Sequence, residues 1–289
     1  MEAARMPTLT TIFNAESWLI NKFYTRIHDL NQNVLVGFFG LPRKGKTYSA
    51  ISLAEQLSEK LGLTPSLDDI TFSVGDMYGL EGLMSRWNRR PPRGTPFGFD
   101  DAGTAGGANA RKWWTAANEA LSTLAQSGGY RGHLIWVSAP EPRDIDGQVR
   151  TLFHMTFETK RINRHRKIVI AKPGIPYTDG KSGKVKTKYP KAYVPGVGMV
   201  RVTRIGFHLP ANANGPFNTW PEYEAKKDAF LHPLYIELQH KAEQGAKRNP
   251  AWAKKAVALL QDAHPDWHQV ELADALGLTQ SAVSKLLKE

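Results

Sequence analysis

The fold is decided by the stretch Val34-Leu-Val-Gly-Phe-Phe-Gly-Leu-Pro-Arg-Lys-Gly-Lys-Thr47. Its first six residues form an apolar run, which is typical of a central parallel strand covered on both faces. From Gly40 to Thr47 the chain fits the pattern G-x-x-x-x-G-K-[ST], and a helical pattern follows from about Lys46 to Leu61. A strand, a glycine-containing loop and a helix in this order predict a phosphate-binding loop.

This loop predicts a site for a nucleoside triphosphate, which we take to be ATP, together with Mg²⁺. Its glycines permit a tight turn whose backbone N–H groups converge on phosphate oxygens, and the following helix adds its positive end. We expect Lys46 to reach the β- and γ-phosphates and the Thr47 hydroxyl to bind Mg²⁺. The predicted nucleotide contacts are Gly40, Arg43, Lys44, Gly45, Lys46, Thr47, Tyr48 and, from a later strand, Ser138.

An acidic pair ends a second apolar segment, Phe97-Gly-Phe-Asp-Asp101. A carboxylate at the end of a neighbouring strand is what a magnesium-bound triphosphate requires. We expect Asp100 to bind Mg²⁺, directly or through water, and Asp101 to act as the general base. The alternative is an exposed acidic turn. Ser138 follows the apolar run 134–137, where its hydroxyl either senses the γ-phosphate or is buried against the backbone.

Strand and helix patterns alternate through the first half of the chain. Strands are predicted at 34–39, 70–74, 97–99 and 134–137, and helices at 46–61, 76–87 and 109–127. This alternation predicts a three-layer α/β domain with a mainly parallel sheet, over about 30–160.

Composition favours a polyanionic partner. The chain carries 38 Lys and Arg against 27 Asp and Glu, for a formal net charge of +11. It has no cysteine, which excludes disulfides, cysteine zinc fingers and thiol catalysis. No apolar run reaches the roughly 20 residues of a membrane helix, and no signal peptide is evident. We therefore expect a protein without a transmembrane segment that is not secreted.

An amphipathic pattern at 14–30 has two interpretations. Its apolar residues lie near one side of a helix: Leu19, Ile20, Phe23, Ile27 and Leu30. This face either packs on the core or a neighbouring subunit, or it lies on a membrane surface.

Positive charge is concentrated at 160–204, which holds 13 Lys and Arg and a single acid, Asp179. Apolar pieces at 168–171 and 199–205 flank Asp179-Gly-Lys-Ser-Gly183, which predicts a β-hairpin with a basic tip. This surface is either a solvated hairpin or a DNA-binding face. The expected DNA contacts are Lys181, Lys184, Lys186 and Lys188.

The C-terminal residues 251–289 predict a small helix-turn-helix domain. Val270, Ala273 and Leu276 share one helical face, Gly277 supplies the turn, and Thr279 caps the second helix. Val283, Leu286 and Leu287 are expected to pack on the first helix. The outward-facing residues, which we expect to contact DNA, are Gln280, Ser281, Ser284 and Lys285. A helical protein-interaction module is the alternative.

Between the acidic pair and the basic segment, the run Leu121 to Arg150 resembles the zonula occludens toxin-like family. The family's pattern is an Arg-x-Gly pair, a hydrophobic strand, a proline, an Ile-Asp pair and an arginine before the next strand. In this chain Arg131 stands where the family places its first arginine, and the Ile-Asp pair at 145–146 and Arg150 follow the strand. Gly215-Pro-Phe-Asn-Thr219 resembles a later family motif, so the resemblance covers about 34–225.

The resemblance implies a RecA-like core of the ASCE type and an ATPase of the FtsK/HerA type, as in phage DNA-packaging and assembly proteins. It also implies a ring, commonly a hexamer, in which an arginine of one subunit completes its neighbour's site. Arg131 is the first candidate for this arginine and Arg150 the second. Two departures are the Asp100-Asp101 pair, where the family usually has Asp-Glu, and Ser138-Ala139, where it usually has Gln.

We therefore predict four segments: an N-terminal helical segment at 1–33, the ATPase domain at 34–225 with its basic β-rich part at 160–205, a helix and linker at 226–250, and the helix-turn-helix domain at 251–289. The leading hypothesis is an ATP-driven DNA translocase for packaging or assembly in a virus or other mobile element. It would act in the host cytoplasm or at the virion, with virion or membrane proteins as further partners, and could attach peripherally to the membrane. The alternative is an ATP-gated DNA-binding or partitioning regulator that hydrolyses little.

Overall fold

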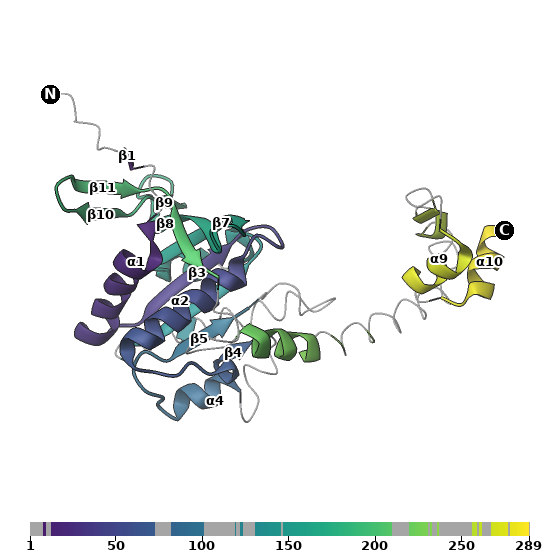
Figure 1. The fold of residues 1–289 in the computed structure, drawn as a ribbon, viewed down its shortest axis with the longest axis horizontal. Coiled ribbons are helices and arrows are strands. Elements are labelled where there is room, and N and C mark those ends of the chain that lie inside the picture. The colour runs from purple at the N-terminus through teal and green to yellow at the C-terminus, as the bar shows by residue number, and fades with distance from the viewer. Residues whose placement is uncertain are drawn as a thin grey trace. The chain divides into compact units, whose positions relative to one another are not determined.

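The computed structural model describes residues 8–9, 13–72, 82–100, 119, 122–123, 131–145, 147–209, 220–230, 232, 236, 256–258, 260–261, 267–276 and 278–288. The chain divides into two compact units, Met1–Ala225 and Lys226–Glu289. The first unit contains the sheets and the second is helical where it is described (Figure 1).

A parallel sheet forms the centre of the first unit. Its strands are β3 (Val34–Phe39), β4 (Ile70–Thr71), β5 (Pro96–Phe99), β6 (Leu134–Ala139) and β7 (Met155–Asn163), in the spatial order β4-β5-β6-β3-β7. Every residue of β3 and β6 is buried, as the apolar run in β3 requires. The strand β6 lies between β3, which leads into the glycine loop, and β5, which leads to Asp100.

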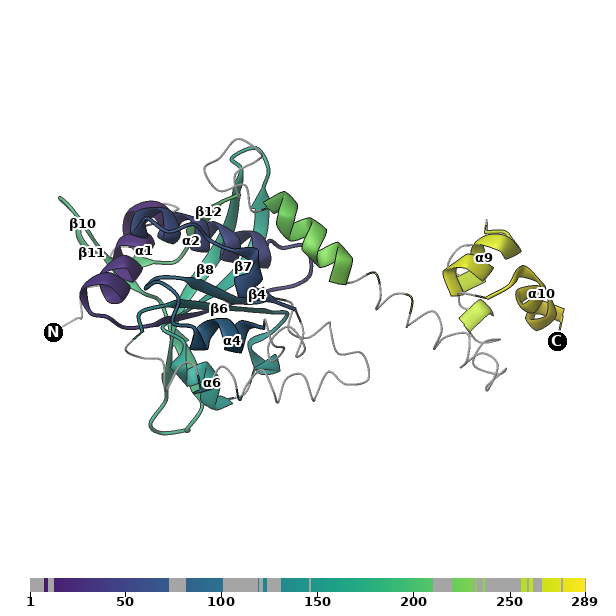
Figure 2. The ribbon, with the colours of Figure 1, turned by 90° about the horizontal axis from the view of Figure 1, so that it is seen from below.

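Helices cover both faces of this sheet (Figure 2). On one face α2 (Lys46–Leu61) packs on β3 and β6, and α1 (Ala15–Tyr24) packs on α2. On the other face lie α4 (Leu83–Asn88) and α6 (Gly147–Leu152). Their side chains Leu83, Trp87 and Val149 join the apolar cluster that β3, β5 and β6 form. The fold is therefore a three-layer α/β sandwich.

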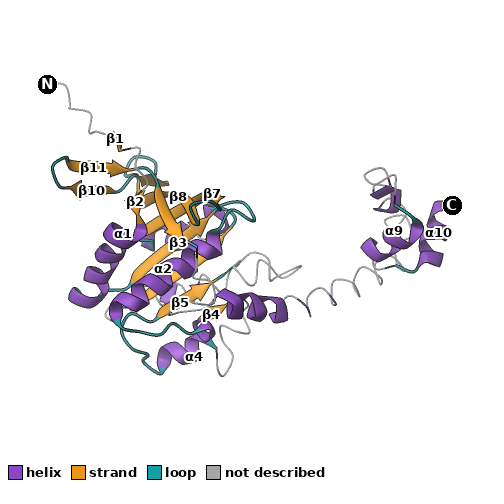
Figure 3. Ribbon diagram, in the orientation of Figure 1, coloured by secondary structure: helices purple, strands orange, loops and turns teal. Residues whose placement is uncertain are grey.

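Beyond β7 the sheet continues in mainly antiparallel strands, although its last pair is parallel; all strands are drawn in orange in Figure 3. The long strand β8 (Ile168–Thr178) pairs with β7 on one side and with β12 (Ile205–His208) on the other, and β12 pairs with β2 (Phe13–Asn14). The distal part of β8 pairs with β9 (Val185–Lys188). A small second sheet contains β10 (Lys191–Val194), β11 (Gly198–Val202) and β1 (Thr8–Leu9).

The observed strand pairing differs from the predicted hairpin, because the two apolar pieces do not pair with each other over their whole length. The segment 168–171 pairs with Ile205–His208, whereas Met199 lies in β11 and pairs with Tyr193 of β10. The hairpin that includes Asp179 is instead β8–β9, with Thr178 opposite Val185. The apolar pieces were too short to reveal that β8 continues as far as Thr178, because its last residues are half-buried or exposed.

The predicted amphipathic helix is buried within the unit. Leu19, Ile20, Phe23 and Ile27 are almost fully buried, in α1 and in the π-helix η1 (Thr25–Asp29) that follows it. The prediction was wrong for Leu30, since its side chain is 57% exposed where the helix ends. The buried face favours core packing over a membrane-surface role. None of the helices in the described residues is both long and apolar enough to cross a membrane.

Two other element boundaries differ from the prediction. The helix predicted at 76–87 is described as α4 only from Leu83, after Gly82 in an extended conformation, and it ends at Asn88. The strand predicted at 70–74 is described as β4 for Ile70–Thr71. Most of the helix predicted at 109–127 lies outside the described residues. Residues 220–230 are helical.

The second unit has its own apolar cluster. Two helices, α9 (Gln269–Leu276) and α10 (Gln280–Lys288), bury Leu272, Ala273 and Val283 against Val257. Val270 is 48% exposed and Leu287 is 37% exposed, so the prediction that both lie on the packed face was wrong. Leu272 takes the buried position because α9 is turned relative to the predicted face. Thr279 Oγ1 accepts a hydrogen bond from the Ala282 N–H at 3.3 Å, as a capping residue does.

Candidate nucleotide-binding site

The predicted phosphate loop connects β3 to α2, at the carboxyl end of the parallel strands, where ligands of open α/β sheets bind. Gly45 adopts φ +90° and Gly40 φ +147°, values that favour glycine. A Cβ atom on Gly40 would lie 2.5 Å from Thr159 Oγ1, and one on Gly45 would lie 2.8 Å from a Val169 methyl group. Both glycines are therefore required by backbone conformation and by close packing against β7 and β8.

The loop presents polar groups to this edge of the sheet. Lys46 is buried and its ammonium donates to the Leu41 carbonyl at 3.4 Å, so the side chain folds back over the loop. Arg43 is exposed and has a positive φ of 61°. Lys44 and Tyr48 are half-buried. The pKa of Tyr48 is raised by burial and, to a smaller extent, by the negative charge of Glu224.

Asp100 lies beside the loop and is completely buried at the end of β5. Its Oδ1 atom accepts hydrogen bonds from Thr47 Oγ1 at 2.9 Å and from Ser138 Oγ at 2.6 Å. Thr47 is 53 residues from Asp100 along the chain and Ser138 is 38 residues away, so the parallel sheet brings the three together. The Ser138 hydroxyl thus contacts the Asp100 carboxylate, an arrangement that neither interpretation of the sequence included.

This arrangement fits a magnesium ion. Mg²⁺ prefers oxygen ligands, and a hydroxyl and a carboxylate oxygen 2.9 Å apart are an appropriate pair. Thr47 and Asp100 would hold the ion. Asp101, the predicted general base, lies outside the described residues, as does the motif Gly215 to Thr219.

Tyr223 is a further residue of this site that the sequence analysis did not predict. The Tyr223 hydroxyl donates a hydrogen bond to Asp100 Oδ2, and its side chain is only 2% exposed. The Tyr223 ring stacks on Trp220 with centroids 5.0 Å apart, and Trp220 stacks on Tyr48 at 4.0 Å. The i, i+3 spacing of Trp220 and Tyr223 would have placed both on one helix face. It could not have identified Asp100 as the partner.

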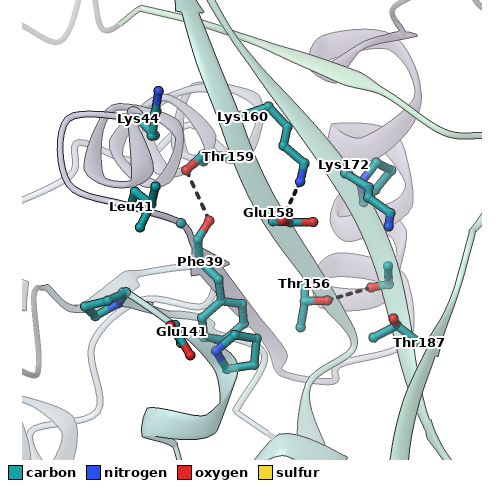
Figure 4. A pocket seen from close by; sticks show the side chains of 15 residues that line it. Phe39, Leu41, Lys44, Glu141, Thr156, Glu158, Thr159, Lys160, Lys172 and Thr187 are labelled. Atoms are coloured by element: carbon teal, nitrogen blue, oxygen red, sulfur yellow. Dashed lines mark hydrogen bonds and ion pairs between the residues drawn. The ribbon is translucent and has the colours of Figure 1, made fainter.

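A cleft of about 520 Å³ lies on the β7 side of the loop. Figure 4 shows Lys44 on the loop and Glu158, Lys160 and Lys172 on the strands around it. Lys160 pairs with Glu158, and the Thr159 hydroxyl donates to the Phe39 carbonyl at 3.1 Å. The cleft is thus lined by charges of both signs and is continuous with the start of the loop.

The two arginine candidates lie elsewhere. Arg131 precedes β6, which runs parallel to β3. It therefore lies at the amino end of the parallel strands, whereas the loop lies at their carboxyl end. Its guanidinium donates to the Trp87 carbonyl at 2.7 Å and lies 5.3 Å from the Trp87 ring centroid. Arg131 therefore cannot reach a nucleotide in the loop of the same chain. Arg150 is half-buried in α6, and its Nε atom has no hydrogen-bond partner in the described part of the chain.

The four lysines of the basic segment lie on the β8–β9 hairpin and its tip. Lys181, Lys184, Lys186 and Lys188 are exposed. Lys186 pairs with Asp179, and the Lys188 ammonium lies 5.7 Å from the Tyr177 ring centroid. In the second unit Gln280, Ser281 and Lys285 are exposed and Ser284 is half-buried, all on α10.

Comparisons with known proteins find solved structures of low similarity to this chain. The N-terminal domain of zonular occludens toxin from Neisseria meningitidis is 16% identical, with a TM-score of 0.31, over 54% of this chain and 94% of that one. A KaiC-like protein from Pyrococcus horikoshii is 14% identical, with a TM-score of 0.26, over 59% of this chain and 89% of that one. This chain resembles the zonula occludens toxin-like family. No family model and no curated protein matches it.

Proposed function

We propose that this protein is an ATP-driven DNA translocase that packages or assembles the genome of a virus or other mobile element. The observation that carries the ATPase part is the buried Asp100 carboxylate, which meets the Thr47 hydroxyl beside the glycine loop. A strand-end carboxylate and a loop hydroxyl at hydrogen-bond distance form the magnesium-binding pair of phosphate-loop proteins.

The positions of the residues support the following proposed roles. The loop N–H groups would bind the phosphates. Lys46, whose ammonium donates to the Leu41 carbonyl in this structure, would neutralise the β- and γ-phosphates. Thr47 and Asp100 would hold Mg²⁺, and the bound ion would supply positive charge that stabilises the transferring phosphoryl group. Ser138 keeps the Asp100 carboxylate in place. Asp101 is proposed to polarise the attacking water.

A ring explains the position of Arg131. Because this arginine precedes β6, at the opposite end of the parallel strands from its own loop, a role at a nucleotide would require one that is bound by a neighbouring subunit. We propose that it stabilises the transition-state charge there, in a ring that is commonly a hexamer in the family resembled. Arg150 is the second candidate for the same role.

The basic hairpin is proposed as the DNA track. A motor passes over every sequence, so it must grip the phosphate backbone, and phosphate contacts position DNA without specifying its sequence. Lys181, Lys184, Lys186 and Lys188 are exposed lysines that suit this purpose. The α10 residues Gln280, Ser281, Ser284 and Lys285 are proposed to select a DNA end or packaging signal. Virion or membrane proteins are proposed as further partners, in the host cytoplasm or at the virion.

The first experiment measures ATP hydrolysis with and without DNA. DNA should stimulate hydrolysis by the wild-type protein, and Lys46→Ala should abolish it, because the variant cannot neutralise the phosphates. Hydrolysis that persists at the wild-type rate in Lys46→Ala would show that the loop is not the active site.

The second candidate is an ATP-gated DNA-binding or partitioning regulator that hydrolyses little. It is favoured by the Asp100-Asp101 pair and by Ser138, because the family resembled usually has Asp-Glu and Gln at these places. Displacement of a triplex-forming strand separates the two functions. A translocase should displace the strand in an ATP-dependent manner, whereas a regulator should leave it bound.

A further inference from the structure

Among the described residues, three hydroxyl groups donate hydrogen bonds to the buried Asp100 carboxylate, and they reach both of its oxygens. Thr47 and Ser138 both donate to Oδ1, whereas Tyr223 donates to Oδ2. A carboxylate left in a buried site without hydrogen bonds would be strongly destabilising. Tyr223 therefore both satisfies Oδ2 and fixes the rotation of the carboxylate about its χ2 bond.

Tyr223 is itself held firmly. Its ring contacts Trp220 at 5.0 Å and Phe72 at 5.7 Å, and its side chain is 2% exposed. Tyr223 belongs to the helical residues 220–230, drawn in green in Figure 1. Because Phe72 directly follows β4, the start of this helix lies beside the carboxyl end of the parallel strands, where Asp100 is located. Trp220 stacks in turn on Tyr48, the residue next to Thr47. The hydrogen bond from Tyr223 to Asp100 and the stacking of Trp220 on Tyr48 thus join this helix to both parts of the predicted magnesium site, the carboxylate and the loop.

We propose that Tyr223 is a positioning residue for magnesium. By holding Oδ2, its hydroxyl keeps Oδ1 facing Thr47, so the oxygen nearest the loop is the one offered to the ion. A tyrosine that blocked the metal would instead be expected on Oδ1, the oxygen shared with Thr47. This inference rests on the proposed ATPase function, and it concerns only how Asp100 is oriented.

The test measures equilibrium binding of a fluorescent ATP analogue, at a series of Mg²⁺ concentrations and in EDTA. Tyr223→Phe removes the hydroxyl and keeps the ring stack. A hydrogen bond to a charged group contributes enough for the Mg²⁺ concentration at half-maximal binding to rise at least about tenfold. Binding in EDTA should stay within about twofold of wild type, because the loop N–H groups and Lys46 are unchanged. Tyr24→Phe, which removes a tyrosine hydroxyl in α1, is the control and should behave as wild type.

A double-mutant cycle with Asp100→Asn separates the loss of a specific interaction between Tyr223 and Asp100 from a general folding defect. If Tyr223 acts through Asp100, adding Tyr223→Phe to Asp100→Asn should cause no further loss of magnesium-dependent binding. Additive losses, an unchanged magnesium dependence of Tyr223→Phe, or a lower Mg²⁺ requirement would each overturn the positioning role. A wild-type protein that binds no nucleotide at all would overturn the proposed function as well, so the two failures are distinguishable.

Discussion

At the scale of the residue, the site depends on glycines that no other residue replaces easily. Gly40 combines a positive φ with a Thr159 carbonyl oxygen that would lie 2.8 Å from an added Cβ. The Thr159 hydroxyl is itself fixed by its hydrogen bond to the Phe39 carbonyl, so the neighbour cannot move away freely. By contrast, Gly62 at the end of α2 has φ +70° and nothing within 4 Å of an added Cβ.

These two glycines form a matched pair for a stability measurement. Gly40→Ala should lower the free energy of unfolding by about 3 kcal/mol, from backbone strain together with overpacking. Gly62→Ala should lower it by about 1 kcal/mol, from the left-handed conformation alone. Urea unfolding of both variants checks the difference. Equal losses would show that the loop relaxes around the extra methyl group.

At the scale of the element, the β8–β9 hairpin decides where the positive charge is presented. Pairing of Tyr177 with Lys186 and of Ile175 with Lys188 places these four side chains on one face of the strand pair. Asp179 partly neutralises this face, since hydrogen bonds from Lys186 and Ser182 lower the pKa of its carboxyl group. Lys184 and Lys188 have no acidic partner among the ion pairs of the described residues.

Lys184 and Lys188 therefore provide the sharper test of the DNA track. Replacing both with glutamine should weaken DNA binding by the same factor for all sequences. The slope of log K against log salt should become shallower by up to about 1.8, since each phosphate that a lysine no longer neutralises accounts for about 0.9. The double variant Lys22→Gln, Lys60→Gln on α1 and α2 removes the same charge and is the control. Equal effects of the two pairs would indicate a response to net charge alone.

At the scale of the whole molecule, two histidines connect stability to pH. Burial lowers the pKa of His133 to about 4, and the charge of Arg131 acts in the same direction. Burial likewise lowers the pKa of His154 to about 4, followed by the charge of Arg26. The His133 ring packs against Trp87 and Phe97, with ring centroids 4.8 and 5.4 Å away. Both imidazoles are therefore neutral in the folded protein at pH 7.

Acid should destabilise the first unit in a defined window. Below the ordinary histidine pKa of 6.5 the unfolded chain binds protons that the folded chain does not, so stability falls as the pH drops from 6.5 to about 4. His133 should account for about 3 kcal/mol over this window, since each pKa unit corresponds to about 1.4 kcal/mol. Urea unfolding as a function of pH measures the slope. His133→Phe should reduce it, whereas His28→Asn, at an exposed position, should not. An unaltered slope in His133→Phe would assign the acid sensitivity to other groups.

The sequence by itself determined the loop, the strand before it, the helix after it and Asp100 at the end of an apolar strand. These features are local, because glycine positions, apolar runs and helical spacing act on neighbouring residues through backbone conformation and burial. The exposure of Leu30 and Val270 was not local, since it depends on where a helix ends and how it turns against its partners. The tertiary structure alone decided that Ser138 contacts Asp100 and that Arg131 lies at the end of the parallel strands opposite the loop. It also brought Tyr223 to a carboxylate 123 residues away, because strand order and helix packing place such groups together and no periodicity in the chain records it.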